Sequence, residues 1–141
     1  MAFRIERDFL GEKKISEHVY WGIHTERARE NFAISRGRII PALIRAGAMV
    51  KKAAALTNSE LGYMDERIAQ AIMRACDDLL AGQLYDQFPL DALQGGAGTS
   101  TNMNMNEVPA NRALEHLGYQ KGRYDIVHPL EHVNLHQSTN D

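Results

Sequence analysis

The sequence predicts a mainly α-helical domain, and two observations lead to this prediction. Apolar residues recur at helical spacing in several stretches, and polar or glycine-containing segments separate these stretches. No internal repeat, low-complexity stretch or flexible linker divides the 141 residues, so one domain is expected. The composition is that of a folded protein, because 44% of the residues are hydrophobic and 24% are charged.

The first third of the chain is expected to begin irregularly and then to become helical. Residues 1–24 mix short apolar and charged runs without a clear period, which predicts an irregular N-terminal segment. Thr25 is a plausible cap for a short helix that reaches Phe32. A longer helix is predicted over residues 39–61, because Pro41 fits a first helical turn and an alanine-rich stretch follows it.

Two more helices are predicted in the rest of the chain. Apolar residues at spacings of four, three and four share one face of the first helix: Ile68, Ile72, Ala75 and Leu79. Asp65 is its expected cap and Gly82 its expected end, and Cys76 is expected to pack within it. After a glycine-containing loop, a helical pattern resumes at Thr99 and continues to Gly118, a natural helix stop.

Charge and cysteine content argue against several classes of protein. A net charge of -2 and a pI near 6.3 give no electrostatic reason to expect a nucleic-acid partner. A single cysteine cannot form an intramolecular disulfide, which fits a reducing compartment. The sequence shows no signal-peptide stretch and no run near the ~18 apolar residues of a membrane helix. We therefore expect a cytoplasmic protein without a membrane partner.

The first candidate site is the stretch Gln-Gly-Gly-Ala-Gly-Thr-Ser-Thr-Asn at residues 94–102. Glycines allow close backbone approach, and the helix N-terminus that follows attracts anions such as a carboxylate or a phosphate. A phosphate loop is disfavoured because no lysine follows the glycines, and no dinucleotide fingerprint is present. Local chemistry leaves open an ordinary glycine turn with Ser/Thr helix capping.

A second candidate is the run Ser138-Thr139-Asn140, whose hydroxyl and amide groups can donate to an oxyanion. Together with Thr99, this run would suit a dicarboxylate. Spacing alone leaves open an ordinary polar turn.

Three histidines form a third candidate. They lie four residues apart and could line one helix face as metal ligands: His128, His132 and His136. Pro129 disfavours helical geometry at His128, and the surrounding residues show no amphipathic period. We therefore expect loop histidines and predict no metal site.

Three longer signatures, in order along nearly the whole chain, resemble those of the aspartase/fumarase family. They are Tyr-Trp-Gly-Ile-His-Thr with Glu-Asn-Phe at 20–32, Gly-Gly-Ala-Gly-Thr-Ser-Thr-Asn-Met-Asn-Met-Asn-Glu-Val at 95–108, and Asn-Leu-His-Gln-Ser-Thr-Asn-Asp at 134–141. Gly-Gly-Ala-Gly-Thr-Ser and Ser-Thr-Asn resemble the aspartate ammonia-lyase branch, whereas fumarases more often show Gly-Ser-Gly-Thr-Gln-Ser and Ser-Ser-Asn.

The resemblance implies a reversible elimination of ammonia from L-aspartate to give fumarate, without an organic cofactor. A base removes a proton beside the β-carboxylate, and the charge moves into that group as an aci-carboxylate. By matching position, Thr99, Ser138 and Thr139 would contact the β-carboxylate. Asn140 would lie near the departing amino group.

The resemblance also implies what the chain lacks. The family's base is a serine on a mobile loop far downstream, so no catalytic base is expected within residues 1–141. This stretch corresponds to the N-terminal lyase domain, without the central helical-bundle and C-terminal domains. Family active sites combine segments from three subunits of a homotetramer, so the isolated chain is expected to be inactive. The alternatives are a fumarate hydratase and a non-catalytic oligomerisation or scaffold protein with the lyase fold.

Two departures from the family pattern limit these expectations. Pro109 replaces the usual apolar residue in a continuing helix, and it removes an N–H bond to the Met105 carbonyl. A kink or an interruption is therefore expected there. The stretch His-Pro-Leu-Glu at 128–131 departs from the fumarase-like His-Pro-Asn-Asp. Leu130 cannot hydrogen-bond a carboxylate, so the second anion site of that branch is not predicted.

Overall fold

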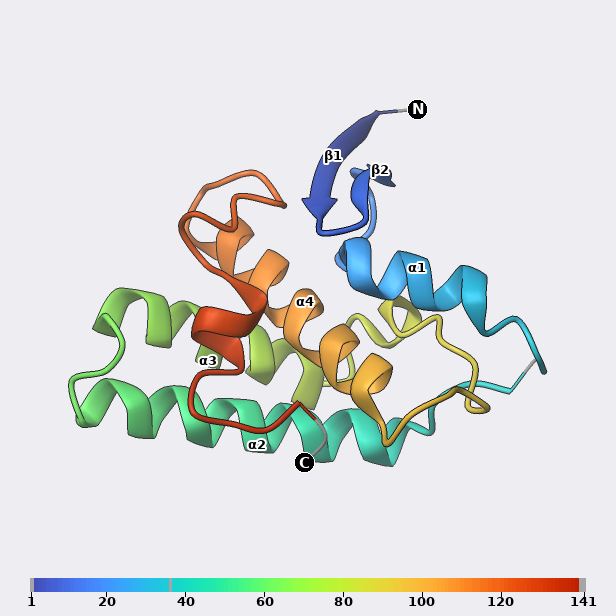
Figure 1. Cartoon of the computed structure of the whole chain (residues 1–141). Helices are drawn as coiled ribbons and strands as arrows, with labels where there is room; N and C mark the ends of the chain where they lie inside the picture. Colours follow the sequence, from blue (N-terminus) through green and yellow to red (C-terminus); the bar gives the residue numbers. More distant parts are fainter. Residues whose placement is uncertain (1, 36, 140–141) are drawn as a thin grey trace.

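Helices form most of the structure, a computed structural model that describes residues 2–35 and 37–139. Within these residues, the regular elements are four α-helices, two strands and two short helical turns (Figure 1). Their bounds are β1 Phe3–Asp8, β2 Gly11–Ser16, α1 Ile23–Asn31, α2 Pro41–Glu60, α3 Glu66–Leu80, η1 Tyr85–Gln87, α4 Thr99–His116 and η2 Pro129–Val133. The predicted mainly α-helical class is confirmed.

The prediction of an irregular N-terminal segment is wrong, because β1 and β2 form an antiparallel hairpin. Phe3 pairs with Ser16 and Asp8 pairs with Gly11, whose φ of +113° places it in the left-handed region that favours glycine. Arg4 ties the hairpin to the following segment by donating to the backbone oxygens of Ser16, Val19 and Trp21. Charged contacts hold this hairpin, so a search for apolar periodicity does not detect it.

Helix α1 begins at Ile23, so the prediction that Thr25 caps it is wrong. Gly22 is the N-cap residue, and Thr25 lies inside the first turn. The backbone N–H of Thr25 donates to a carboxylate oxygen of Glu107 at 3.1 Å. A distant acidic side chain therefore takes the place of a local cap.

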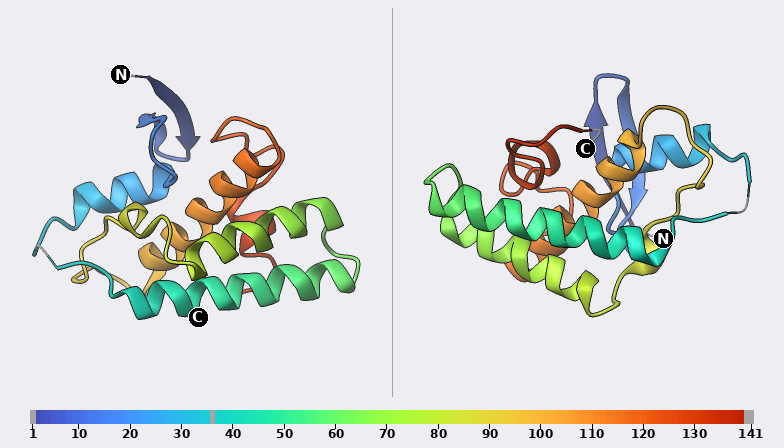
Figure 2. Two further views of the ribbon diagram at one scale, coloured as in Figure 1. Left: turned by 180° about the vertical axis from the view of Figure 1, so that it is seen from behind. Right: turned by 90° about the horizontal axis from the view of Figure 1, so that it is seen from below.

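Helices α2 and α3 lie side by side and run in opposite directions, and α4 packs against α3 (Figure 2). The predicted helix over 39–61 is confirmed, with Pro41 in the first turn. Asp65 caps α3 as predicted, because its Oδ1 accepts from the N–H groups of Arg67 and Ile68 at 2.9 and 3.3 Å. Gly82 follows the end of α3 with a φ of +87°. No helix in the described part of the chain is long and apolar enough to cross a membrane.

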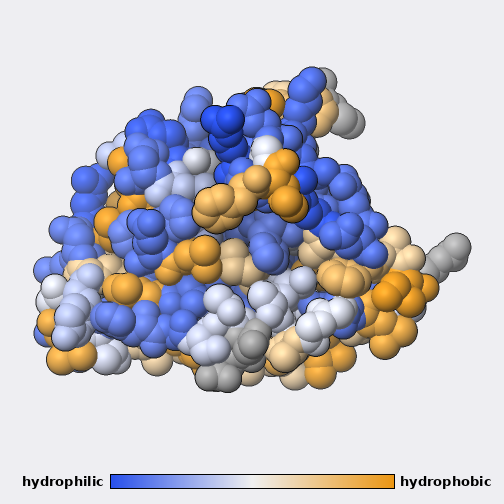
Figure 3. Space-filling view, viewed as in Figure 1, coloured by the Kyte–Doolittle hydropathy of each residue, from blue (hydrophilic) through white to orange (hydrophobic). Residues whose placement is uncertain are grey.

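Helix α2 has apolar residues on its exposed side as well as on its buried side. Four large apolar residues of this helix are exposed: Leu43, Met49, Val50 and Leu56. In Figure 3, apolar surface is visible along the lower edge of the molecule, where α2 lies. The opposite side of α2 contributes Ile44, Ala48 and Ala55 to the core.

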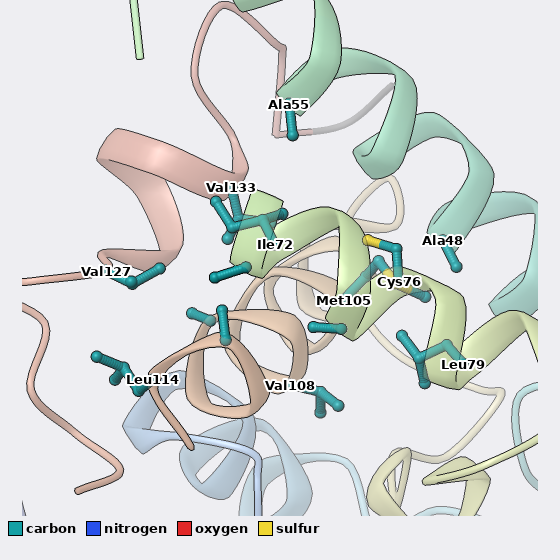
Figure 4. Packing of buried hydrophobic residues seen from close by; sticks show 14 of the residues in the cluster. Ala48, Ala55, Ile72, Cys76, Leu79, Met105, Val108, Leu114, Val127 and Val133 are labelled. Carbon is teal, nitrogen blue, oxygen red and sulfur yellow. The ribbon is translucent and has the colours of Figure 1, made fainter. Parts of the chain in front are cut away.

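The core lies between α2, α3 and α4, and Figure 4 shows its buried side chains. Cys76 is fully buried there, as predicted, and burial raises the pKa of its thiol to about 12. Helix α4 runs through Pro109, so the expectation of an interruption there is wrong. Val108 and Ala110 on either side of the proline are both 0% exposed. Packing around this turn therefore offsets the lost backbone hydrogen bond.

Candidate functional site

The glycine-containing loop leads directly into the first turn of α4. Gly96 and Gly98 have φ values of +82° and +89°, so the backbone here requires glycine. Thr99 is the first residue of α4 and is partly exposed. The turn is capped by Gln94, whose Oε1 accepts from both the backbone N–H and the hydroxyl of Thr101 at 3.1 Å. A glutamine before the glycines thus provides the cap that local chemistry would assign to Ser or Thr.

The loop is anchored at its beginning by Asp91. One carboxylate oxygen accepts from the hydroxyl of Ser35 at 2.6 Å and from the N–H of Leu93 at 2.9 Å. The hydrogen bond from Ser35 is the main reason that the pKa of Asp91 lies below its usual range. The backbone oxygen of Asp91 accepts from Gln94 Nε2 at 2.9 Å. These contacts place Gln94 so that it can cap α4.

The second candidate segment follows η2 and ends at the surface. Ser138 and Thr139 are both exposed. Asn140, the third predicted residue of this segment, lies outside the described residues. Residues 138–139 therefore lie at a surface that a ligand or another protein is able to reach.

Asn134 joins the two candidate segments. Its Oδ1 accepts from Asn102 Nδ2 at 3.0 Å, from Asn106 Nδ2 at 3.1 Å and from Lys51 Nζ at 2.9 Å. Its Nδ2 donates to the backbone oxygen of Gln137 at 3.0 Å. Asn102 lies three residues after Thr99, and Gln137 directly precedes Ser138. One buried amide therefore fixes the 134–139 segment against the first two turns of α4.

Helix α2 holds the same segment at a second point. Asn58 Nδ2 donates to the backbone oxygen of Leu135 at 3.1 Å, and Asn58 Oδ1 lies 2.8 Å from His136 Nδ1. Asn58 is seven residues after Lys51, which places both on one face of α2. His136 has a positive φ of +59°, which is uncommon for a residue other than glycine. The turn before Ser138 is thus held in an uncommon backbone conformation by side chains from a different helix.

The three predicted histidines do not converge on a common point. His128 Nδ1 accepts from the backbone N–H groups of Leu130 and Glu131 at 3.0 and 3.2 Å. His132 Nδ1 accepts from the N–H of His128 at 2.8 Å, while His136 faces Asn58. Among the described residues, no group of three His, Cys, Asp or Glu side chains is placed to hold a metal ion. His132 lies within η2 and His128 is the N-cap residue of η2, so the expectation of loop histidines is wrong for His132.

The sequence motifs did not identify two buried acidic residues, Glu107 and Glu6. Glu107 is 2% exposed, and its carboxylate accepts from the N–H groups of Gly22, His24 and Thr25. Burial raises the pKa of Glu107 to about 7, although hydrogen bonds from Thr25 and Gly22 oppose this shift. Glu6 Oε2 accepts from the next N–H, that of Ile23, at 2.8 Å. Glu107 was detectable as the only charged residue between positions 94 and 111.

Lys51 is the third buried residue that the sequence motifs did not identify. It is 3% exposed, and burial lowers its pKa to about 8. Its Nζ donates to Asn134 Oδ1 and Gln137 Oε1, each at 2.9 Å. The sequence does not indicate that Lys51 is buried, because the adjacent Lys52 has the same side chain and lies nearer the surface.

A cavity of about 780 Å³ lies away from the predicted carboxylate-binding residues, although His128 of the predicted histidine group lines it. It is bounded by the hairpin turn, the start of α1, α4 and η2, and its lining includes Phe9, Leu10, His24, Glu107 and Leu130. Neither Thr99 nor the 138–139 segment lines it.

Comparison with known proteins identifies the relatives of this chain. Residues 11–141 match the family model described as Lyase. An aspartate ammonia-lyase of Helicobacter pylori strain J99 is 57% identical over 140 residues. An aspartate ammonia-lyase of Escherichia coli strain K12 is 53% identical over 141 residues. Each alignment covers 98% of this chain and 30% of the relative, so the chain spans about a third of their length.

Solved structures show the same arrangement of elements. The fumarate lyase:delta crystallin from Brucella melitensis in native form has a TM-score of 0.97 at 55% identity, over 100% of this chain and 33% of its own. The recombinant class II fumarase from Schistosoma mansoni has a TM-score of 0.92 at 38% identity, over 99% of this chain and 30% of its own.

Proposed function

The chain belongs to the aspartase/fumarase family of lyases, and we propose that it supplies carboxylate-binding residues to an aspartate ammonia-lyase of the relatives' length. The reaction is the reversible elimination of ammonia from L-aspartate to give fumarate. The observation that carries this proposal is the junction at Asn134, which links the first turns of α4 to the 134–139 segment. Aspartate ammonia-lyases at 53–57% identity support the choice of substrate.

The proposed role of the hydroxyl groups follows from the charge that the reaction creates. When a base removes the proton beside the β-carboxylate, negative charge accumulates on that carboxylate. Donors already aimed at a developing oxyanion stabilise the transition state strongly, since they need no reorganisation. We assign this task to Thr99, Ser138 and Thr139, and we place Asn140 near the departing amino group. No organic cofactor takes part.

The exposure of the proposed residues supports a site that further protein completes. Ser138 and Thr139 are exposed, and no serine loop of the type that carries the family's base is found in the sequence. The apolar residues exposed along α2 also fit a face that is covered in a larger assembly. We propose that the active form is a homotetramer, in which the site combines segments of three subunits.

Hydration of fumarate to malate is the second candidate reaction. The likeness to the class II fumarase of Schistosoma mansoni favours it, at 38% identity. The Gly-Gly-Ala-Gly-Thr-Ser and Ser-Thr-Asn stretches resemble the ammonia-lyase branch instead. A non-catalytic scaffold remains a third alternative, and it requires that the site residues have no role.

A hybrid lyase tests the proposal directly. In this hybrid, the chain replaces the matching third of the Escherichia coli relative, with which it is 53% identical. We expect the purified hybrid to form fumarate from L-aspartate at a rate well above its rate with malate. The remaining two thirds of the relative, expressed alone, is the control and should be inactive. A hybrid that folds and assembles but converts only malate would replace the proposal by the hydratase reaction, and one that converts neither would favour the scaffold.

A further inference from the structure

Among the described residues, the ammonium group of the buried Lys51 contacts only neutral acceptors. Its Nζ donates to Asn134 Oδ1 and to Gln137 Oε1, each at 2.9 Å. Across residues 2–35 and 37–139, no carboxylate lies within salt-bridge distance of this nitrogen. Two amide oxygens therefore hold a positive charge that is almost entirely removed from water.

These two amides connect Lys51 to both candidate segments. Gln137 directly precedes Ser138, and its Nε2 also donates to the backbone oxygen of Val133 at 2.9 Å. Asn134 accepts from Asn102 in the first turn of α4. The ammonium group thus lies where α2, α4 and the hydroxyl-bearing segment meet.

Folding stability alone does not account for a lysine at this place. A buried ammonium group without a paired carboxylate costs free energy, because hydration is lost and no opposite charge replaces it. Methionine has similar length and would fill this volume without that cost. Residues that oppose stability in this way are typical of functional sites.

We propose that Lys51 is a positioning residue: its ammonium group holds Asn134 and Gln137, and thereby keeps the segment 138–139 in place for a substrate carboxylate. The inference rests on the proposed function, since it assumes that this segment meets a carboxylate. Its structural part, the order of the segment, is measurable without any activity.

The first experiment compares Lys51→Met with Lys52→Met in the 141-residue chain. Lys52 is a matched control, because it is the next residue of α2 and its Nζ pairs at the surface with Asp77 at 2.6 Å. The readouts are the thermal unfolding midpoint and the hydrogen exchange of the Gln137 amide, which donates to the Asn134 carbonyl at 3.0 Å. For Lys51→Met we expect roughly tenfold faster exchange at Gln137 and an unfolding midpoint that is no lower. The Lys52→Met chain should exchange like the unsubstituted chain.

The second experiment measures kcat and KM for L-aspartate with the same substitutions in the hybrid lyase. We expect Lys51→Met to lower kcat/KM by roughly tenfold or more, mainly through a higher KM, and Lys52→Met to stay within about twofold. Lys51→Arg, which keeps the charge and the donors, should recover part of the loss. Gln137→Met, which removes one acceptor and leaves the lysine, should raise KM by roughly threefold.

The outcomes separate the two proposals. Unchanged exchange at Gln137 in the Lys51→Met chain overturns the positioning role. A lower unfolding midpoint or a failure to fold also overturns it, because the lysine is then a structural residue. Unchanged KM in both Lys51→Met and Gln137→Met overturns the link to the substrate. An inactive unsubstituted hybrid counts against the proposed function instead, and the exchange result then still decides the structural part.

Discussion

The Glu107 carboxylate on α4 accepts a hydrogen bond from the backbone N–H of Gly22 at 2.9 Å, across 85 residues of sequence. Glu107 also accepts from the N–H groups of His24 and Thr25. The N–H of Ile23, which lies between Gly22 and His24 in sequence, donates to Glu6. Two buried carboxylates thus occupy four consecutive N–H groups at the start of α1. The free N–H groups make a helix N-terminus positive and favour a negative charge there, but burial opposes the charge of Glu107 more strongly.

We predict that Glu107 makes stability depend on pH. Its pKa is raised from the ordinary 4.5 to about 7, so between these values the folded chain keeps a proton that the unfolded chain has lost. The contribution of this proton is fully present below pH 4.5 and is lost as the pH rises through 7. Urea unfolding of the chain at a series of pH values should show this trend, and Glu107→Gln should flatten it. An equal pH dependence in both proteins would contradict the prediction.

Glu107→Ala should destabilise the chain at every pH. The substitution leaves two buried N–H groups and one partly buried N–H group without their acceptor, and one such buried group costs about 1–3 kcal/mol. We expect a loss of about 3 kcal/mol or more in the free energy of unfolding. Glu115→Ala on the same helix is the control, because Glu115 is exposed and should cost much less. A loss below about 1 kcal/mol for Glu107→Ala would show that water replaces the carboxylate without difficulty.

Lys51 should produce the opposite kind of pH dependence. Burial lowers its pKa from the ordinary 10.5 to about 8, so the charged form of this lysine is less favourable in the folded chain than in the unfolded chain. Between these pH values the unfolded chain binds the proton more tightly, and stability therefore rises as the pH rises from 8 towards 10.5. The difference in unfolding free energy between Lys51→Met and the unsubstituted chain should be largest below pH 8 and should shrink above it. A constant difference across this range would contradict the lowered pKa.

The thiol of Cys76 should be inert in the folded chain. It is 0% exposed, and burial raises its pKa to about 12, so almost no thiolate forms near neutral pH. An aromatic disulfide reagent should react with this thiol only as fast as the chain unfolds. In urea, the reaction rate should rise to the rate measured for a small free thiol. Rapid reaction in the native chain would show that the packing between α2 and α3 opens readily.

Thr139→Val tests the proposed chemistry in the hybrid lyase. If its hydroxyl donates to the aci-carboxylate, turnover should fall ~100- to 1,000-fold with a smaller change in KM. If Thr139 is only a turn residue, the substitution should cost about 1 kcal/mol of stability at most and leave kcat within a few-fold. Steady-state kinetics beside thermal unfolding distinguishes these results.

The isolated chain should be folded, helical and without lyase activity. The helices α1 to α4 should dominate its circular dichroism spectrum. The proposed site residues are exposed at 138–139, and the base expected from the family lies outside the sequence. Formation of fumarate from L-aspartate by the purified 141-residue chain would disprove the division of the site between separate segments.

The sequence by itself determined the helices and the family. Apolar spacing located α3 and α4, because burial on one side of a helix imposes a periodic pattern on the residues themselves. Pro41 and the alanine-rich stretch after it located α2. Local chemistry fixed the cap at Asp65 and the stops at Gly82 and Gly118, because these interactions reach only a few residues along the chain. The three signatures indicated the lyase family, and the comparisons confirmed it.

Only the tertiary structure decided how the candidate site and α1 are held. Glu107 caps α1, and Asn134 joins α4 to the hydroxyl-bearing segment, through hydrogen bonds between residues that lie 28–85 positions apart. The buried charge of Lys51 and the continuity of α4 through Pro109 likewise depend on the surrounding packing. A polar side chain has the same identity whether it is exposed or buried. Its role becomes defined only when the fold removes water and supplies its partner.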